Sequence, residues 1–177
     1  MNITHDDMAN GVGLRVVLWV AGCSHHCKSC QNPTTWDENA GIIFDDDARN
    51  EIFHALGKSY IHGITFSGGD PLFFKNRETI TSLAKEIKEL FPNKSIWCYT
   101  GYEFEDIQDL EITKYVDVFV VGKFKEELAD VNFKWAGSTN QRVMKKQCDG
   151  SFINESSTGL VVRDEIVSDK AACCCTN

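Results

Sequence analysis

Three cysteines lie close together near the amino end of this 177-residue chain, at Cys23, Cys27 and Cys30. Their spacing is C-x3-C-x2-C, and a short loop with three thiolates can bind three irons of a cubane [4Fe–4S] cluster. Most electron-carrying clusters are held by four cysteines. A set of three leaves one iron open to a small molecule, as the open position of a catalytic zinc site does. The spacing therefore indicates catalysis at a cluster rather than electron storage.

A second motif, Ser67-Gly68-Gly69-Asp70, directly follows an apolar stretch. The two glycines allow backbone groups to approach a ligand closely, and the Asp70 carboxylate can accept a hydrogen bond from a ligand ammonium. Gly-Gly-Asp is also an ordinary turn signal, in which Asp70 would only cap a turn or helix. The motif gains specificity because it comes one predicted strand after the cysteine loop.

The elements that must position these motifs alternate between strands and helices. Apolar runs and helical periodicity identify them, and Asp45 is a candidate helix cap. The predicted strands are 14–20, 61–66, 95–99 and 116–121. The predicted helices are 45–56, 76–90 and 104–110.

This alternation predicts an α/β fold with a parallel sheet, right-handed crossovers and helices outside. In such sheets the chemistry gathers at the carboxyl ends of the strands. The predicted strand ends carry the cysteine loop, Gly68-Gly69-Asp70, Thr100-Gly101 and Gly122-Lys123. A closed eight-unit barrel needs about 200 residues or more. We therefore expect an open partial (βα) barrel whose open side can admit another protein's loop.

Composition argues against several classes of partner. The net charge of −8 argues against nucleic acid. No apolar run reaches the roughly 20 residues that a membrane helix needs, and no signal peptide is visible. The cysteines cluster with metal-ligand spacing, which favours a reducing compartment over a disulfide framework.

The paired motifs resemble those of the radical S-adenosylmethionine enzymes and, within them, the activating proteins of anaerobic (class III) ribonucleotide reductases. The resemblance covers roughly residues 10 to 145. We expect residues 1–147 to form the radical S-adenosylmethionine domain and residues 148–177 to be a flexible C-terminal extension. The matching stretches are 10–15, the cysteine loop with Asn32 and Thr35-Trp36, 67–72, 99–102, 122–124 and 137–141.

The resemblance implies a set of site residues in an open partial barrel of the radical S-adenosylmethionine type. The cluster ligands would be Cys23, Cys27 and Cys30. No side chain is implied as catalytic, since the cluster and S-adenosylmethionine carry the chemistry. The S-adenosylmethionine site would be lined by Ser29, Cys30, Gln31, Gly68, Gly69, Asp70 and Thr100.

The resemblance also implies a reaction and its partners. A reduced cluster would give one electron to the sulfonium of S-adenosylmethionine, and the C–S bond would break to leave methionine and a 5′-deoxyadenosyl radical. That radical would take a hydrogen from a glycine Cα in the large subunit of an anaerobic ribonucleotide reductase. A reductant such as flavodoxin would supply the electron, and the protein would work in the cytoplasm.

The residues also allow other interpretations. One is a small-molecule radical S-adenosylmethionine enzyme, such as 7-carboxy-7-deazaguanine synthase. Another is a non-catalytic metal-binding module, for example a zinc knuckle completed by His25, His26 or Cys148. Otherwise we expect the two histidines to be solvated loop residues or packing partners, and Arg15 to pair with a surface acid.

The carboxyl-terminal part of the chain gives weaker signals. Residues 151–159 are polar enough to be a linker. Cys173, Cys174 and Cys175 precede the last two residues and are expected to lie in a mobile tail with exposed thiols. A second metal site or a redox relay is the alternative for these three thiols.

Overall fold

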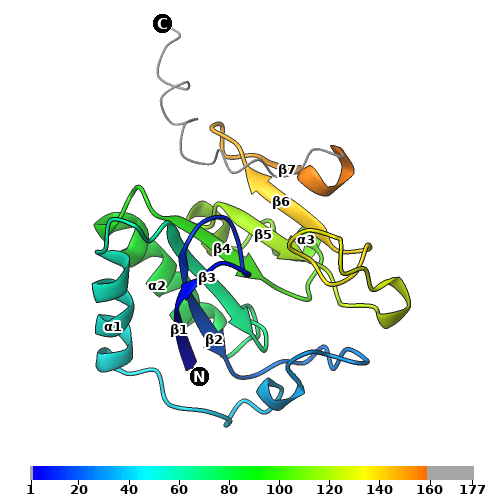
Figure 1. The fold of residues 1–177 in the computed structure, drawn as a ribbon, viewed down its shortest axis with the longest axis horizontal. Coiled ribbons are helices and arrows are strands. Elements are labelled where there is room, and N and C mark those ends of the chain that lie inside the picture. The colour runs from blue at the N-terminus through cyan, green and yellow to red at the C-terminus, as the bar shows by residue number, and fades with distance from the viewer. Residues whose placement is uncertain (1, 159–177) are drawn as a thin grey trace, which may run out of the picture.

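The structure of the chain is a computed structural model that describes residues 2–158. It is an α/β fold around a seven-stranded mixed sheet, in which the strands lie side by side in chain order (Figure 1). The strands are β1 (Asn2–Asp7), β2 (Arg15–Val20), β3 (Gly63–Gly68), β4 (Ser95–Tyr99), β5 (Val118–Val121), β6 (Arg142–Lys146) and β7 (Phe152–Asn154). The helices are α1 (Asp46–Leu56), α2 (Arg77–Leu90) and α3 (Phe104–Ile107), and short 3-10 turns cover Pro33–Thr35, Glu111–Lys114, Glu126–Leu128 and Glu155–Thr158.

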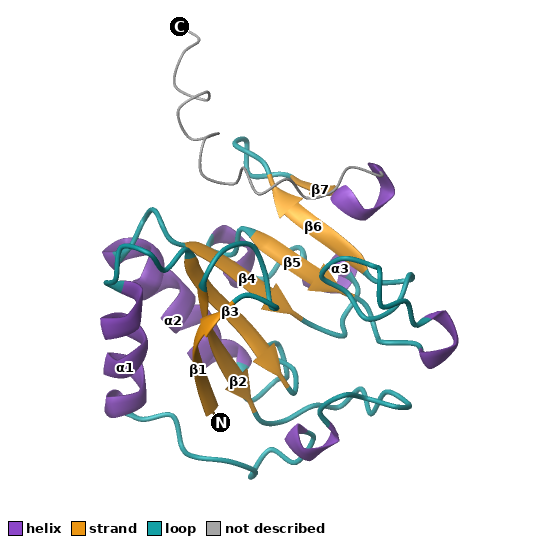
Figure 2. Cartoon of the chain, in the orientation of Figure 1, coloured by secondary structure: helices purple, strands orange, loops and turns teal. Residues whose placement is uncertain are grey.

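The four central strands, β2 to β5, are parallel, as their apolar runs predicted. Buried apolar side chains alternate between the two faces of this part of the sheet, as strand geometry requires. The larger core cluster lies on the face that α1 and α2 cover (Figure 2). On the opposite face a smaller cluster joins Trp97 and Val120 to Trp135 in the segment between β5 and β6.

Both long helices begin and end close to their predicted bounds. The Asp45 side chain accepts a hydrogen bond from the Ala48 N–H at 2.9 Å, which caps α1. The buried face of α1 includes Ile52 and Leu56. The helical periodicity of α2 predicts an apolar stripe of Ile80, Leu83, Ala84, Ile87 and Leu90. The first four are buried, whereas Leu90, the last residue of the helix, is exposed, contrary to the prediction.

The prediction of a wholly parallel sheet is wrong at both edges. Strand β1 pairs antiparallel with β2, and β6 and β7 continue the sheet antiparallel from β5. These edge strands are short, and their few apolar residues, such as Val143 and Met144 in β6, reach the core without forming a long apolar run or a regular alternation. The predicted linker over 151–159 is also wrong for residues 152–158, which form β7 and a 3-10 turn.

Arg15 does not pair with a surface acid, contrary to expectation. It is fully buried in the sheet face opposite α1 and α2. Its guanidinium donates to Thr65 Oγ1, to Ser95 Oγ and to the backbone carbonyls of Val12, Ile64 and Ser95. Burial lowers the pKa of Arg15 to about 10, so the side chain keeps its charge at neutral pH.

Two predictions, on membrane helices and on the carboxyl-terminal cysteines, can be compared with residues 2–158 alone. Among residues 2–158, no helix is long and apolar enough to cross a membrane. The predictions for Cys173, Cys174 and Cys175 lie outside the described residues.

Candidate cluster and cofactor site

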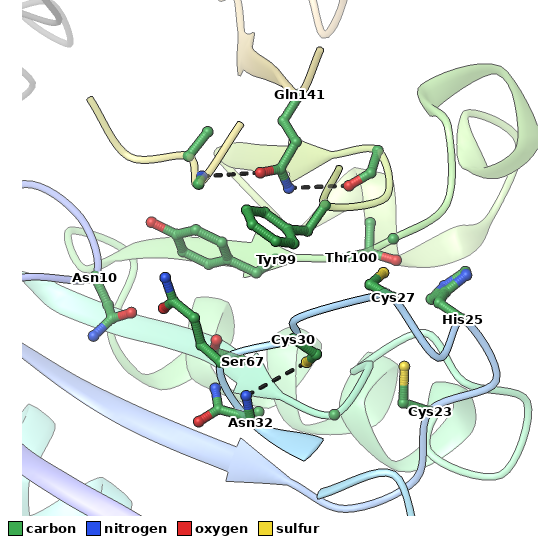
Figure 3. Close-up of a pocket in the computed structure, with 18 of the residues that line it drawn as sticks. Asn10, Cys23, His25, Cys27, Cys30, Asn32, Ser67, Tyr99, Thr100 and Gln141 are labelled. Carbon is green, nitrogen blue, oxygen red and sulfur yellow. Dashed lines mark hydrogen bonds between the residues drawn. The ribbon is translucent and has the colours of Figure 1, made fainter. Parts of the chain in front are cut away.

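A cavity of about 380 Å³ opens at the carboxyl ends of β2, β3 and β4, on the sheet face opposite α1 and α2. This volume is within the range of small-molecule sites. Figure 3 shows Cys23 and Cys27 on the side of the cavity away from Asn10, with Cys30 between them and Asn10. Most of the predicted site residues line it: Cys23, Cys27, Cys30, Gln31, Gly68, Gly69 and Thr100.

The cysteine loop is closed at its base by backbone hydrogen bonds. The Gly22 N–H donates to the Thr35 carbonyl at 2.8 Å, and the Cys23 N–H donates to the Trp36 carbonyl at 3.2 Å. The thiols of Cys23, Cys27 and Cys30 are unbridged and partly exposed. The loop therefore presents three accessible thiols from a backbone that is fixed at both ends.

The thiols are spread around the cavity rather than gathered at a point. Within residues 2–158, no group of three His, Cys, Asp or Glu side chains surrounds the position of a single metal ion. A tetrahedral zinc site needs four donors within about 2.0–2.3 Å of one ion. A cubane takes each thiolate at a different iron, so its ligands need not converge. Three thiols that do not converge on one point are compatible with this mode of binding.

The walls of the cavity contain features that a bound group would satisfy or hold in place. Burial raises the pKa of the Cys23 thiol, so metal binding there must release the proton. The indole nitrogens of Trp36 and Trp135 are buried and have no hydrogen-bond partner within the described part of the chain, and both residues line the cavity. Trp135, which lines the cavity, has positive φ without being glycine, an unfavourable conformation that clusters at functional sites.

The two glycines of the second motif are required by the chain's own backbone. A Cβ on Gly68 would lie 2.6 Å from the backbone nitrogen and oxygen of Val20, and a Cβ on Gly69 would lie 2.6 Å from the Gly22 carbonyl oxygen. The close approach is used for hydrogen bonds at 2.8 Å, from Gly69 N–H to the Val20 carbonyl and from Asp70 N–H to the Gly22 carbonyl. The two sequence motifs are thus joined directly, backbone to backbone.

Asp70 is buried and does not line the cavity, with 1% of its surface exposed. Its Oδ1 accepts from the Leu72 N–H at 2.7 Å and from Thr100 Oγ1 at 2.9 Å. Its Oδ2 accepts from the Gly101 N–H at 3.0 Å and lies 2.7 Å from His25 Nε2. The carboxylate therefore caps a turn and ties three segments together, instead of pointing at the cavity.

His25 is the site residue that sequence reasoning missed. Its side chain is only 7% exposed and is paired with Asp70, whereas His26 is exposed and has an edge contact with Trp36 at 4.9 Å. The expectation of a solvated loop residue or packing partner is confirmed for His26 and is too weak for His25. A polar loop gives no periodicity that could distinguish two adjacent histidines.

The segment between β5 and β6 forms one wall of the cavity. Gln141 holds this segment in shape, because its Oε1 accepts from the Gly137 N–H at 2.9 Å and its Nε2 donates to the Gly122 carbonyl at 3.0 Å (Figure 3). Phe124 and Trp135 from the same segment line the cavity. Sequence resemblance marked these stretches without indicating that they form a wall.

Ser29 does not line the cavity either. Its Oγ donates to Glu126 Oε1 at 2.6 Å, and the neighbouring Lys28 makes an ion pair with Glu126 at 2.8 Å. Glu126 belongs to the 3-10 turn in the segment between β5 and β6. The cysteine loop and this segment are therefore linked across the outer side of the site.

Comparison with known proteins agrees with this site. Residues 9–144 match the model of a family described as a 4Fe-4S single cluster domain. An anaerobic ribonucleoside-triphosphate reductase-activating protein from Enterobacteria phage T4 is 48% identical over 137 residues, which are 77% of this chain and 87% of that protein. Proteins of the same name match from Haemophilus influenzae, at 41% identity over 76% of this chain and 90% of that protein, and from Escherichia coli strain K12, at 38% over 77% and 92%.

The cysteine loop, the double-glycine turn and the shared cavity all lie inside the matched residues. The relatives are matched over most of their own length, so the likeness is not confined to one motif. The chain belongs to the family of anaerobic ribonucleoside-triphosphate reductase-activating proteins.

Proposed function

We propose that this protein binds a [4Fe–4S] cluster and S-adenosylmethionine, cleaves S-adenosylmethionine reductively, and generates a glycyl radical on an anaerobic ribonucleotide reductase. The observation that carries the proposal is the cavity itself. Three unbridged thiols and the double-glycine turn face the same space of about 380 Å³. Relatives named as activating proteins of this reductase support the choice of partner.

The residues have distinct roles in this proposal. Cys23, Cys27 and Cys30 bind three irons and leave the fourth for S-adenosylmethionine. The parallel strands β2 to β5 and the helices that cover them form the open partial barrel of a radical S-adenosylmethionine domain over residues 1–147. The wall that contacts S-adenosylmethionine is formed by Cys30, Gln31, Gly68, Gly69 and Thr100, with Ser29 at its rim and Asp70 behind it.

When held by Cys23, Cys27 and Cys30 and reduced, the cluster would supply the one electron that breaks the C–S bond of S-adenosylmethionine, and a glycine Cα of the reductase would be the source of the hydrogen atom that the adenosyl product gains. The chain's own residues orient the reactants and exclude water. The backbone at Gly68 and Gly69 offers a surface without side chains. Trp36 and Trp135 supply aromatic surface to the wall of the cavity.

The partners follow from the same site. The cavity opens at the sheet face that α1 and α2 leave uncovered, so a glycine loop from the reductase large subunit can reach it. The electron comes from a reductant such as flavodoxin, and the reaction runs in the cytoplasm. The acidic character of the chain, with a net charge of −8, does not suit nucleic acid as a partner.

The proposal is tested by anaerobic reconstitution with iron and sulfide, reduction, and assay for 5′-deoxyadenosine. Cys27→Ala should bind less iron and form no product, while circular dichroism shows a native fold, because Cys27 is in a partly exposed loop. The matched control is Cys98→Ala, since Cys98 is fully buried in β4 and lies outside the loop. Product formation by Cys27→Ala would show that the ligand assignment is wrong. A fully loaded wild-type cluster that never reacts, even with the reductase present, would favour a non-catalytic metal-binding module.

A further inference from the structure

The gap between Cys23 and Cys27 contains three polar residues, and the middle one is turned inward. Ser24 and His26 are exposed, whereas the His25 side chain is 7% exposed. A histidine that was merely solvated would not be buried between two exposed polar neighbours. Its burial indicates a specific partner.

Three contacts fix the His25 ring. Its Nε2 lies 2.7 Å from Asp70 Oδ2, and its ring meets the edge of Tyr102 with 4.7 Å between the centroids. Gly101 lies directly against the ring, because a Cβ built on Gly101 would be 2.4 Å from His25 Cδ2. These partners come from the ends of β3 and β4, so the ring bridges the cysteine loop to both strand ends.

Asp70 is a rigid acceptor for this bridge. Its oxygens also accept from the Leu72 N–H, from Thr100 Oγ1 and from the Gly101 N–H. An ionised carboxylate only accepts hydrogen bonds, so the contact is a hydrogen bond in the tautomer of His25 that carries hydrogen on Nε2. With four hydrogen-bonding partners around it, the Asp70 carboxylate is held in one orientation. Its contact with His25 therefore restrains the cysteine loop.

We propose that His25 is a positioning residue. Through its hydrogen bond to Asp70 it holds the cysteine loop in a fixed position relative to the ends of β3 and β4, which line the proposed S-adenosylmethionine site. The proposal deepens the proposed function and rests on it. The loop base is already held by backbone hydrogen bonds at Gly22 and Cys23. The His25–Asp70 pair holds the part of the loop between the first two ligands, which those bonds do not reach.

The test compares His25→Ala and His25→Gln in the full chain, with His26→Ala as the matched control. Glutamine can place an amide N–H where His25 Nε2 donates to Asp70, whereas alanine cannot. Gly101→Ala is a second disrupting variant, since its Cβ would push the ring away while His25 and Asp70 are both retained. It keeps the proposal testable if His25→Ala does not fold.

Two readouts are needed. The first is amide hydrogen exchange over residues 22–36 of the metal-free chain, which reports loop order without any cofactor. The second is the electron paramagnetic resonance spectrum of the reduced cluster, titrated with S-adenosylmethionine, with iron content measured in parallel.

We expect His25→Ala and Gly101→Ala to speed loop exchange by about 10- to 100-fold and to raise the S-adenosylmethionine concentration for the half-maximal spectral change by about tenfold or more, the effect of losing a hydrogen bond to a charged group. Iron content should stay near wild type, because the three thiols remain. His25→Gln should recover most of both effects, and His26→Ala should match wild type.

Contrary results are equally clear. Unchanged exchange and titration in His25→Ala would overturn the proposal. Faster exchange with an unchanged titration would reduce His25 to a merely structural residue, and a His25→Gln variant as defective as alanine would exclude the hydrogen bond as the cause. A wild-type cluster whose spectrum does not respond to S-adenosylmethionine would instead count against the proposed function. The hydrogen-exchange data would still test whether His25 holds the cysteine loop.

Discussion

Asp70 makes more contacts than the Gly-Gly-Asp motif alone would predict. Its side chain accepts hydrogen bonds from Leu72, Thr100 and Gly101 and pairs with His25, and its own N–H donates to the Gly22 carbonyl. The carboxylate is at once a turn cap and a junction between the two motifs. We therefore expect Asp70 to contribute to the stability of the fold as well as to the site.

Replacement of Asp70 should therefore affect stability first. Asp70→Ala leaves several buried donors without an acceptor, and we expect it to lower the free energy of unfolding by about 3–5 kcal/mol. Urea denaturation measures this, with Asp109→Ala as the control, because Asp109 is exposed. Equal stability of the two variants, together with a loss of S-adenosylmethionine binding in Asp70→Ala alone, would restore Asp70 as a direct ligand contact.

At the scale of elements, the central strands and long helices could be predicted because each carries its own apolar pattern. Strands β2 to β5 are buried on both faces and read as continuous apolar runs, and α2 shows a clean stripe. Strands β1, β6 and β7 were not predicted, since they are short and their few apolar residues form no long run or regular alternation, so pairing with the neighbouring strand completes their definition. The cavity residues were identified by motif, but the roles of His25 and Asp70 depend on contacts between distant segments.

The pairing of β3 with β4 depends on one glycine at its start. Gly63 is paired with Ser95, and a Cβ on Gly63 would lie 1.9 Å from the Ser95 carbonyl oxygen, which is backbone and cannot rotate away. We expect Gly63→Ala to cost about 3 kcal/mol or more, because these strands must separate. Thermal unfolding measures this. Gly57→Ala is the control, with its nearest contact at 3.4 Å, and a Gly63 variant as stable as this control would contradict the account.

At the scale of the whole molecule, the helices leave one sheet face free, and the loops at the carboxyl ends of the strands gather there. The segment between β5 and β6 returns over this face and contacts the cysteine loop through Glu126. The matched family model ends at residue 144, and the last strand within residues 2–158 ends at Asn154. The residues with proposed roles therefore all precede the carboxyl-terminal segment.

A variant that ends at residue 158 should keep the site. We expect it to bind iron and to form 5′-deoxyadenosine at a rate within about twofold of the full chain, since each proposed ligand and wall residue is retained. Product assay and iron content, measured side by side with the full chain, check this. A loss of cluster binding in the shortened chain would show that the last residues, including Cys173, Cys174 and Cys175, contribute to the metal site.

The most direct measurement follows the hydrogen atom itself. The reduced, cluster-loaded protein is mixed with S-adenosylmethionine and an anaerobic ribonucleotide reductase whose glycines carry deuterium at Cα. The account predicts a glycyl radical signal on the reductase together with 5′-deoxyadenosine that has gained one deuterium. Undeuterated 5′-deoxyadenosine with no radical on the reductase would contradict it, because the C–S bond would then break without the reductase as hydrogen donor.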